Sequence, residues 1–182
     1  MELAEHQSNL IADLERYSRK YPQESDTVEL FIDFVKRNVD CFSRDLQEGH
    51  ITGSAWIQDE TGAFALLTHH GKLDRWFQVG GHCEGETKAQ DASFREATEE
   101  SGLTDLKFVS EEIFDIDRHL FPEKNGFPAH YHYDVRFLLK TSDKSKIAIS
   151  EESQDLQWFI SSAIANVTDE ESVLRMVRKT KL

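Results

Sequence analysis

The chain has 182 residues, of which 38% are hydrophobic, and its 34 acidic residues outnumber its 21 basic residues to give a formal net charge of −13. This length and apolar fraction suffice for one domain with an appendage. The negative charge argues against nonspecific binding to nucleic acid or to an anionic membrane surface, because both are polyanions that repel it.

The first predicted elements are two helices, at 3–20 and 25–40, separated by a Tyr-Pro pair. Apolar residues recur in both at the spacing of one helix face. We interpret residues 1–48 as a helical hairpin, an appendage packed on a domain at 49–182. Its apolar stripes then serve either as part of the core or as the surface of a homodimer.

From residue 50 onward the sequence pattern changes to that of strands. A strand is predicted at 51–58 and an antiparallel partner at 63–69, joined by an Asp-Glu-Thr-Gly turn. The elements expected after this hairpin are, in chain order, a helix at 88–101, strands at 106–114, 131–139 and 156–160, and a closing helix at 173–179.

The helix predicted at 88–101 carries three carboxylates on one face. Glu96, Glu99 and Glu100 stand at positions i, i+3 and i+4, which share a face of a helix. Glu96 and Glu100 repel each other across one turn, near the negative end of a helix that Gly102 terminates. An ordinary solvated acidic face is the alternative. The two unfavourable charge effects favour a bound divalent cation, for which Mg²⁺ is the simplest candidate.

The segment from Gly81 to Leu103 resembles the Nudix box, in which glycines, glutamates and an Arg-Glu pair stand at fixed spacings. The residues in register are Gly81, Arg95, Glu96, Glu99, Glu100, Gly102 and Leu103, with Ala97 as the small apolar residue. One position departs from the pattern. The box expects its first glutamate at position 87, where this chain has Thr87, and Glu86 lies one residue earlier.

The resemblance implies an α/β fold, a Nudix-like α/β/α sandwich with a mixed sheet, to which the N-terminal helical hairpin is added. It also implies a Nudix-type pyrophosphohydrolase that cleaves the diphosphate linkage of a nucleoside diphosphate joined to a group X, such as a nucleotide or a sugar. The cofactor would be Mg²⁺ or Mn²⁺, bridging phosphate oxygens while water attacks phosphorus in line. The alternative is a non-hydrolytic Nudix-like nucleotide-binding regulator. Such modules commonly lose box carboxylates, which this chain keeps.

The same resemblance assigns roles to residues of the box. The metal ligands would be Gly81, Glu96, Glu99 and Glu100. Arg95 cannot bind a metal, and we expect its guanidinium to pair with Glu99 or a neighbouring loop acid and so fix the ligand geometry. The general base stays open between Glu100, Glu151 and Glu152. The expected catalytic residues are therefore Arg95, Glu100 and Glu152.

A second group of polar residues lies in the strand predicted at 131–139. Alternation puts His130, His132 and Asp134 on one face of that strand. This face suggests either a second metal site or a surface that binds phosphate and sugar oxygens; a polar face next to solvent is the alternative. We place substrate binding by His130 and His132 ahead of metal binding, because sites of the Mg²⁺ type prefer oxygen ligands. His82, in the box loop, is a further candidate for substrate binding.

The compartment is predicted from three absences in the sequence. The chain has no apolar run of about 18 residues, and its N terminus has neither the basic nor the apolar region of a signal peptide. Cys41 and Cys83 form neither a CxxC pair nor a disulfide framework, which suits a reducing compartment. We therefore expect a soluble cytoplasmic protein, without a membrane or nucleic-acid partner, that acts on a phosphorylated small molecule.

Overall fold

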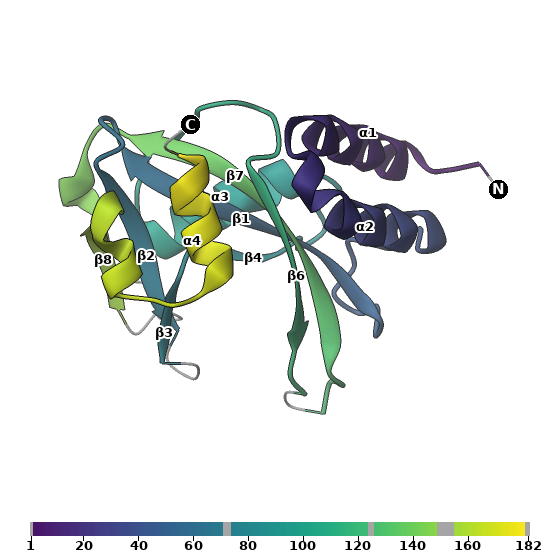
Figure 1. The fold of residues 1–182 in the computed structure, drawn as a ribbon. Coiled ribbons are helices and arrows are strands. Elements are labelled where there is room, and N and C mark those ends of the chain that lie inside the picture. The colour runs from purple at the N-terminus through teal and green to yellow at the C-terminus, as the bar shows by residue number, and fades with distance from the viewer. Residues whose placement is uncertain (1, 71–73, 124–125, 149–154, 181–182) are drawn as a thin grey trace.

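The computed structural model describes residues 2–70, 74–123, 126–148 and 155–180. Within these ranges the strands form one mixed sheet, with helices packed against it (Figure 1). This architecture confirms the α/β class and the mixed sheet expected from the sequence. None of the helices in the described ranges is long and apolar enough to cross a bilayer.

The described strands are β1 (Gly49–Asp59), β2 (Phe64–His70), β3 (Arg75–Phe77), β4 (Val79–His82), β5 (Lys107–Phe108), β6 (Asp115–Phe121), β7 (His130–Thr141) and β8 (Asp155–Ile160). The helices are α1 (Glu5–Lys20), α2 (Ser25–Arg37), α3 (Ala89–Ser101) and α4 (Glu171–Lys179), with short 3-10 helices η1 (Pro22–Glu24), η2 (Lys144–Lys146) and η3 (Ser161–Asn166). Most of the predicted elements are present, with ends that shift by a few residues.

The strand predicted at 106–114 is wrong for most of its length. Within it only β5 pairs with β7, and the chain then leaves the sheet at the polar run 110–112. The sheet resumes with β6, which the sequence analysis does not predict because each face mixes apolar residues with charged or polar ones. Strands β3 and β4 are also absent from the prediction, because segments of three and four residues carry too little periodicity.

Two long parallel strands, β1 and β7, form the centre of the sheet. Their register places His50 beside His132 and Thr52 beside Asp134. The first half of β1 also pairs antiparallel with β4, and its last residues pair with β2. On the other side of this centre, β6 pairs antiparallel with β7. The first halves of β1 and β7 thus bring together residues from four strands.

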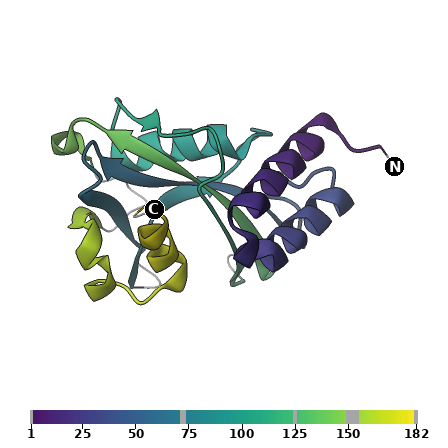
Figure 2. The same cartoon turned by 45° about the horizontal axis from the view of Figure 1, so that its top comes forward.

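Helices α3 and α4 lie on opposite sides of the sheet (Figure 2). Close approach of α3 requires small residues on both partners: a methyl group on Gly53 of β1 would come within 2.5 Å of the Ala89 carbonyl oxygen. Ala92 and Ser93, on the helix side of this contact, are also buried. This packing fixes the position of α3, and with it the three glutamates of the predicted metal site.

The N-terminal helices α1 and α2 pack on the sheet, as the sequence analysis expects. The ring of Tyr133 in β7 stacks on Phe34 at a centroid distance of 4.0 Å and meets Phe31 edge to face. The apolar stripes of both helices belong to the same buried cluster as residues of β1, β7 and α3. The stripes therefore serve as core. The division into 1–48 and 49–182 stays a prediction.

A buried network of charges joins the sheet to α4 and α1. Arg136 of β7 is 2% exposed and forms ion pairs with Asp115, Asp117 and Asp134. Lys179 of α4 donates a 2.6 Å hydrogen bond to the Asp115 carboxylate and also contacts the Tyr17 hydroxyl of α1. These charges satisfy one another inside the protein, where an unpaired charge is costly.

Candidate active site

Two of the three clustered glutamates meet a Gly-Gly segment in β4. Helix α3 ends as predicted at Gly102, which has a left-handed conformation with φ of 70°. The Gly80 N–H donates a 2.8 Å hydrogen bond to the Glu100 carboxylate. Gly81 lies so close to Glu96 that a methyl group on it would come within 2.5 Å of that carboxylate. The helix face and the strand thus bring Glu96 and Glu100 to one place.

Arg95 connects the carboxylates of this region. Its Nε donates to Glu86 at 2.8 Å, and its Nη1 donates to Glu96 at 2.8 Å and to Glu99 at 3.1 Å. Its Nη2 donates to the His82 carbonyl oxygen at 2.7 Å. Arg95 therefore pairs with both of the expected partners, Glu99 of the helix and an acid of the loop, Glu86. Charge-assisted bonds of this kind restrict where the carboxylates lie.

The displaced glutamate of the box, Glu86, lies within this cluster. The hydrogen bond from Arg95 holds the pKa of the Glu86 carboxyl below its usual value, against the opposing effect of partial burial. Thr87, which occupies the position where the box expects glutamate, is exposed. The loop before α3 therefore compensates for the one-residue displacement and brings a carboxylate to Arg95.

The donor atoms gathered here suit a hard divalent cation. Glu86, Glu96 and Glu99 share one guanidinium, and Glu100 adds a further carboxylate nearby, so negative charge exceeds positive charge. The Glu99 side chain is 60% exposed and remains accessible to an ion and its water ligands. Carboxylate oxygens are the ligands that Mg²⁺ and Mn²⁺ prefer. The residues expected to bind metal thus fit these ions chemically.

We expect Gly81→Ala to weaken activation by Mg²⁺ at least about tenfold, because the new methyl group displaces the Glu96 carboxylate. Disturbing a group that orients a metal ligand typically costs about 10–100-fold in metal affinity or activity. The melting temperature should change little, since the displaced atoms are the end of a flexible side chain. Turnover measured against Mg²⁺ concentration tests this. In a Glu96→Gln background the same substitution should add almost nothing. An effect of equal size in both backgrounds would contradict the mechanism.

A cluster of histidines lies beside this carboxylate region, from three strands. The centroid of the His50 ring is 4.9 Å from those of His82, His130 and His132. His50, His130 and His132 are buried, whereas His82 is partly exposed. The segment from Gly80 to His82 contacts both groups, because Gly80 and Gly81 meet the glutamates and the His82 ring meets His50.

Asp134 shares a strand face with these histidines, as predicted, but its carboxylate is already occupied. It accepts hydrogen bonds from the hydroxyls of Thr52 at 2.9 Å and Ser54 at 2.7 Å. It also accepts from the Gln78 amide at 3.2 Å and from Arg136 at 2.7 Å. These four donors use the acceptor capacity of the carboxylate. Asp134 therefore organises the sheet rather than facing a ligand.

Burial keeps two of the histidines neutral. Burial, followed by the neighbouring histidines, lowers the pKa of His132 to about 2. Burial, followed by His82 and His130, lowers the pKa of His50 to about 4. At neutral pH both rings are therefore uncharged, and each has a nitrogen with a free electron pair that can accept a hydrogen bond or bind a metal.

His50 is a site candidate that the sequence analysis missed. Its only local signal is its place at the beginning of β1, and its proximity to His132 depends on the pairing of strands far apart in the chain. Glu151 and Glu152, two of the three candidates for the general base, lie outside the described residues. Cys83 is buried, and burial raises the pKa of its thiol, so it is a poor nucleophile.

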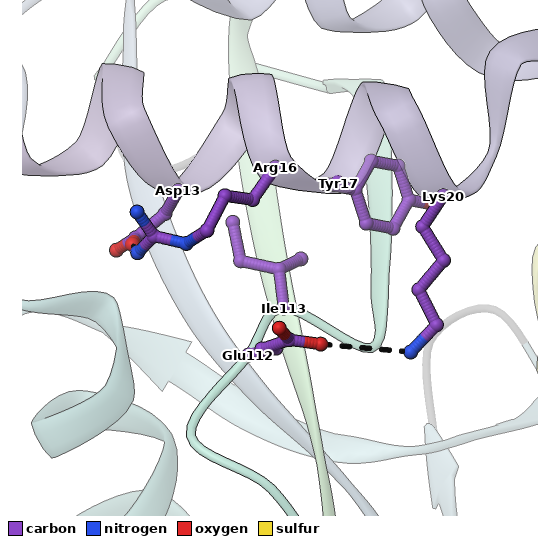
Figure 3. Close-up of a pocket in the computed structure, with 6 residues that line it drawn as sticks. All are labelled: Asp13, Arg16, Tyr17, Lys20, Glu112 and Ile113. Carbon is purple, nitrogen blue, oxygen red and sulfur yellow. Dashed lines mark hydrogen bonds and ion pairs between the residues drawn. The ribbon is translucent and has the colours of Figure 1, made fainter.

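A small pocket lies between α1 and the segment before β6 (Figure 3). Its lining residues are Asp13, Arg16, Tyr17, Lys20, Glu112 and Ile113. At its edge Lys20 and Glu112 form an exposed ion pair at 3.7 Å. None of these residues belongs to the carboxylate or histidine cluster, so this pocket is separate from the candidate active site.

The sequence matches a known family model. The model described as "NUDIX domain" matches residues 50–177, which is more than half of the chain. A search of the curated proteins finds no match. The match covers the sheet, the box helix and most of α4, and it leaves α1 and α2 outside.

Solved structures share this fold at low sequence identity. The structure of a C. elegans Ap4A hydrolase in a binary complex has a TM-score of 0.58 and 18% identity, over 72% of this chain and 94% of that chain. A NUDIX family hydrolase from Clostridium perfringens has a TM-score of 0.57 and 22% identity, over 72% and 96%. The E. coli dihydroneopterin triphosphate pyrophosphohydrolase has a TM-score of 0.55 and 17% identity, over 71% and 92%. Identities this low establish the fold alone.

Proposed function

This chain belongs to the NUDIX family, and from that premise we propose that it is a metal-dependent hydrolase of the diphosphate linkage in a nucleoside diphosphate joined to a group X. The family assignment makes it a pyrophosphohydrolase. The observation that carries the proposal is the cluster of Glu96, Glu99 and Glu100 around Arg95 and the Gly-Gly segment. A regulator that only binds nucleotides has no need of this full set of carboxylates.

We assign Glu96, Glu99, Glu100 and the Gly81 carbonyl as the residues that would hold Mg²⁺ or Mn²⁺. A bound cation of this type neutralises charge on phosphate oxygens and lowers the pKa of an attacking water. Arg95 is a positioning residue, because it donates to two of these carboxylates and to the backbone of β4. Its other bonds, to Glu86, hold the end of the box loop against the helix.

For the general base we propose Glu100, with Glu152 as the second candidate. The Gly80 N–H fixes one oxygen of the Glu100 carboxylate at 2.8 Å and so orients the group. A base must lie within hydrogen-bond reach of the water whose proton it accepts. A carboxylate oriented toward the metal-binding region meets this requirement. Glu152, as an acidic loop residue before the strand of Trp158, is proposed on the resemblance to the family alone.

For substrate binding we propose His82. Its carbonyl oxygen accepts from Arg95 and its ring lies against His50, so it borders the carboxylate cluster and remains partly exposed. His130 and His132, expected from the sequence to bind substrate as well, are 7% and 8% exposed. Such burial favours a role inside the protein over direct contact with a phosphorylated ligand.

The substrate class can be narrowed by a screen of nucleoside triphosphates, dinucleoside polyphosphates and nucleotide sugars, each with Mg²⁺ and with Mn²⁺. Two of the structural neighbours are named for activity on Ap4A and on dihydroneopterin triphosphate, so both compounds belong in the screen. We expect one class to give two phosphorylated products, with no turnover in the presence of a chelator. Tight binding of a nucleotide without hydrolysis under any metal condition would instead favour the regulator.

A further inference from the structure

Three buried histidines meet at the beginning of the two central strands. His50 of β1 pairs directly with His132 of β7, and His130 lies two residues earlier on the same face. One nitrogen from each ring lies within 4.8 Å of the corresponding nitrogens of the other two. The rings come from strands that the sheet holds in fixed register, so this proximity is a property of the fold.

His50 lacks a well-formed hydrogen bond to offset its burial. The residue is 1% exposed, and among the described residues neither ring nitrogen has a hydrogen bond of normal geometry, although the Leu46 backbone lies near the ring and opposes the lowering of its pKa. A buried polar group without a partner typically costs about 1–3 kcal/mol and calls for an explanation such as a bound ion. The polar edge of His50 lies among the rings of other histidines, which are common metal ligands.

The other two histidines are arranged as metal ligands usually are. The Nδ1–H of His130 donates a 2.8 Å hydrogen bond to the Pro128 carbonyl oxygen, which leaves its Nε2 with a free electron pair. This Nε2 lies 3.1 Å from Nε2 of His132, a hydrogen bond between the two rings that a bound ion would replace. Two nitrogens on a tetrahedral zinc ion lie roughly 3.3 Å apart, given Zn–N bonds of about 2.0–2.1 Å. The observed separation is close to that value.

We propose that His50, His130 and His132 bind a transition-metal ion, with Zn²⁺ as the best fit, at a site separate from the glutamate cluster. Three imidazole nitrogens favour Zn²⁺ over Mg²⁺, whereas the carboxylates of α3 have the opposite preference. Asp134 is not a ligand, because its carboxylate is occupied by four donors from the protein. A fourth coordination position remains for water or another ligand.

The surroundings shield such an ion from solvent. The Phe121 ring stacks on His132 at a centroid distance of 4.8 Å, and Phe127 meets His130 edge to face at 4.8 Å. A bound ion would join β1 to β7 and thereby stabilise the start of the central parallel pair.

The proposal can be tested on the full chain after treatment with a chelator. Co²⁺ serves as an optical probe, and Zn²⁺ is then titrated in competition, both in an excess of Mg²⁺ that fills the carboxylate site. We expect one equivalent of Co²⁺ to bind, with the visible absorption of a nitrogen-rich tetrahedral site, and Zn²⁺ to displace it. Zn²⁺ should also raise the melting temperature of the wild-type protein.

Matched variants locate the site. His50→Ala and His132→Ala should each weaken Zn²⁺ binding more than about tenfold. Loss of a residue that only supports a metal ligand already lowers metal affinity by about 10–100-fold. His6→Ala is the control for loss of a histidine, since its ring bonds the Val39 carbonyl and meets Phe42, neither of which belongs to the histidine cluster. Glu100→Gln is the control for the carboxylate site. Both controls should bind Zn²⁺ as the wild type does.

Three results would overturn the proposal. They are an absence of Co²⁺ and Zn²⁺ binding in the wild type, unchanged affinity in folded His50→Ala, and loss of binding in Glu100→Gln alone. Long-range ¹H–¹⁵N spectra of the wild type provide a test that does not depend on how the variants fold. Addition of Zn²⁺ should shift ring nitrogens of His50, His130 and His132, and shifts confined to other histidines would exclude the site.

Discussion

Glu100→Gln is expected to lower kcat by more than about a hundredfold while the protein stays folded. The substitution preserves the shape of the side chain and an oxygen that can accept the Gly80 N–H, but it removes the negative charge. Loss of an outer-shell partner already costs about 10–100-fold at a metal site, and Glu100 is proposed as a direct ligand and as the base. Glu99→Gln should also lower kcat, because Glu99 is proposed as a metal ligand but not as the base.

Stability should move in the opposite direction to activity in Glu100→Gln. Glu96 and Glu100 repel each other across one turn of α3, so removing one charge should stabilise the metal-free helix by about 0.2–0.5 kcal/mol. Thermal unfolding followed by circular dichroism measures this change in stability. Steady-state kinetics at saturating Mg²⁺ measure the loss of kcat. Glu29→Gln, on the exposed face of α2, is the matched control and should leave both unchanged. Wild-type kcat in Glu99→Gln and Glu100→Gln would refute the metal-site assignment.

Arg136→Met is expected to lower the free energy of unfolding by about 3–5 kcal/mol, the usual cost of removing one partner from a buried ion pair. Arg136 is 2% exposed and pairs with Asp115, Asp117 and Asp134, so its loss leaves buried carboxylates without a counterion. Chemical denaturation followed by circular dichroism gives the difference directly. The control is Arg75→Met, an exposed residue paired with Glu170, for which we expect a change within about 0.5 kcal/mol.

The pH dependence provides a second check on Arg136→Met. Burial alone would raise the pKa of Asp117, but the hydrogen bond with His119 and the charges of Arg136 and Arg175 outweigh it and hold this pKa below its usual value. A carboxyl with a lowered pKa in the folded state stabilises the protein above its unfolded pKa, near 4, and loses that contribution as the pH falls. The difference between wild type and variant should therefore shrink in acid. A constant difference from neutral pH to acid would contradict the electrostatic explanation.

The parts of the site that lie close together in the sequence were predictable. The spacing of Glu96, Glu99 and Glu100 depends on helix periodicity alone, and Gly102 marks the end of the helix by its conformation. The pairing of Arg95 with a carboxylate was predictable because acidic residues surround it in the sequence. Helix α3 and strands β1, β2, β7 and β8 likewise show their own periodicity or apolar character in the sequence.

The parts that depend on strand pairing were not predictable from local patterns. His50 joins the histidine cluster only because β1 and β7 run parallel in one register. The occupation of Asp134 depends on Thr52 and Ser54, about eighty positions away in the chain. Strand β6 mixes polar and apolar residues on both faces, and its pairing with β7 places Asp117 beside Asp134 and His119 beside His132, so its alternation does not mark a core face. Glu86 departs from the expected position, and only the loop conformation shows that it reaches Arg95.

The contact between Tyr17 and Lys179 has a consequence for the order in which the protein folds. These residues stand 162 positions apart, and the pair lies where α1, the Asp115 carboxylate and α4 meet. Helices α1 and α2 can form from local contacts within microseconds, whereas contacts between distant parts of a chain form slowly. The N-terminal hairpin therefore forms early but can complete its docking only after the central strands have paired and α4 has packed. We therefore expect the final attachment of this hairpin to come late in folding, after the sheet has formed.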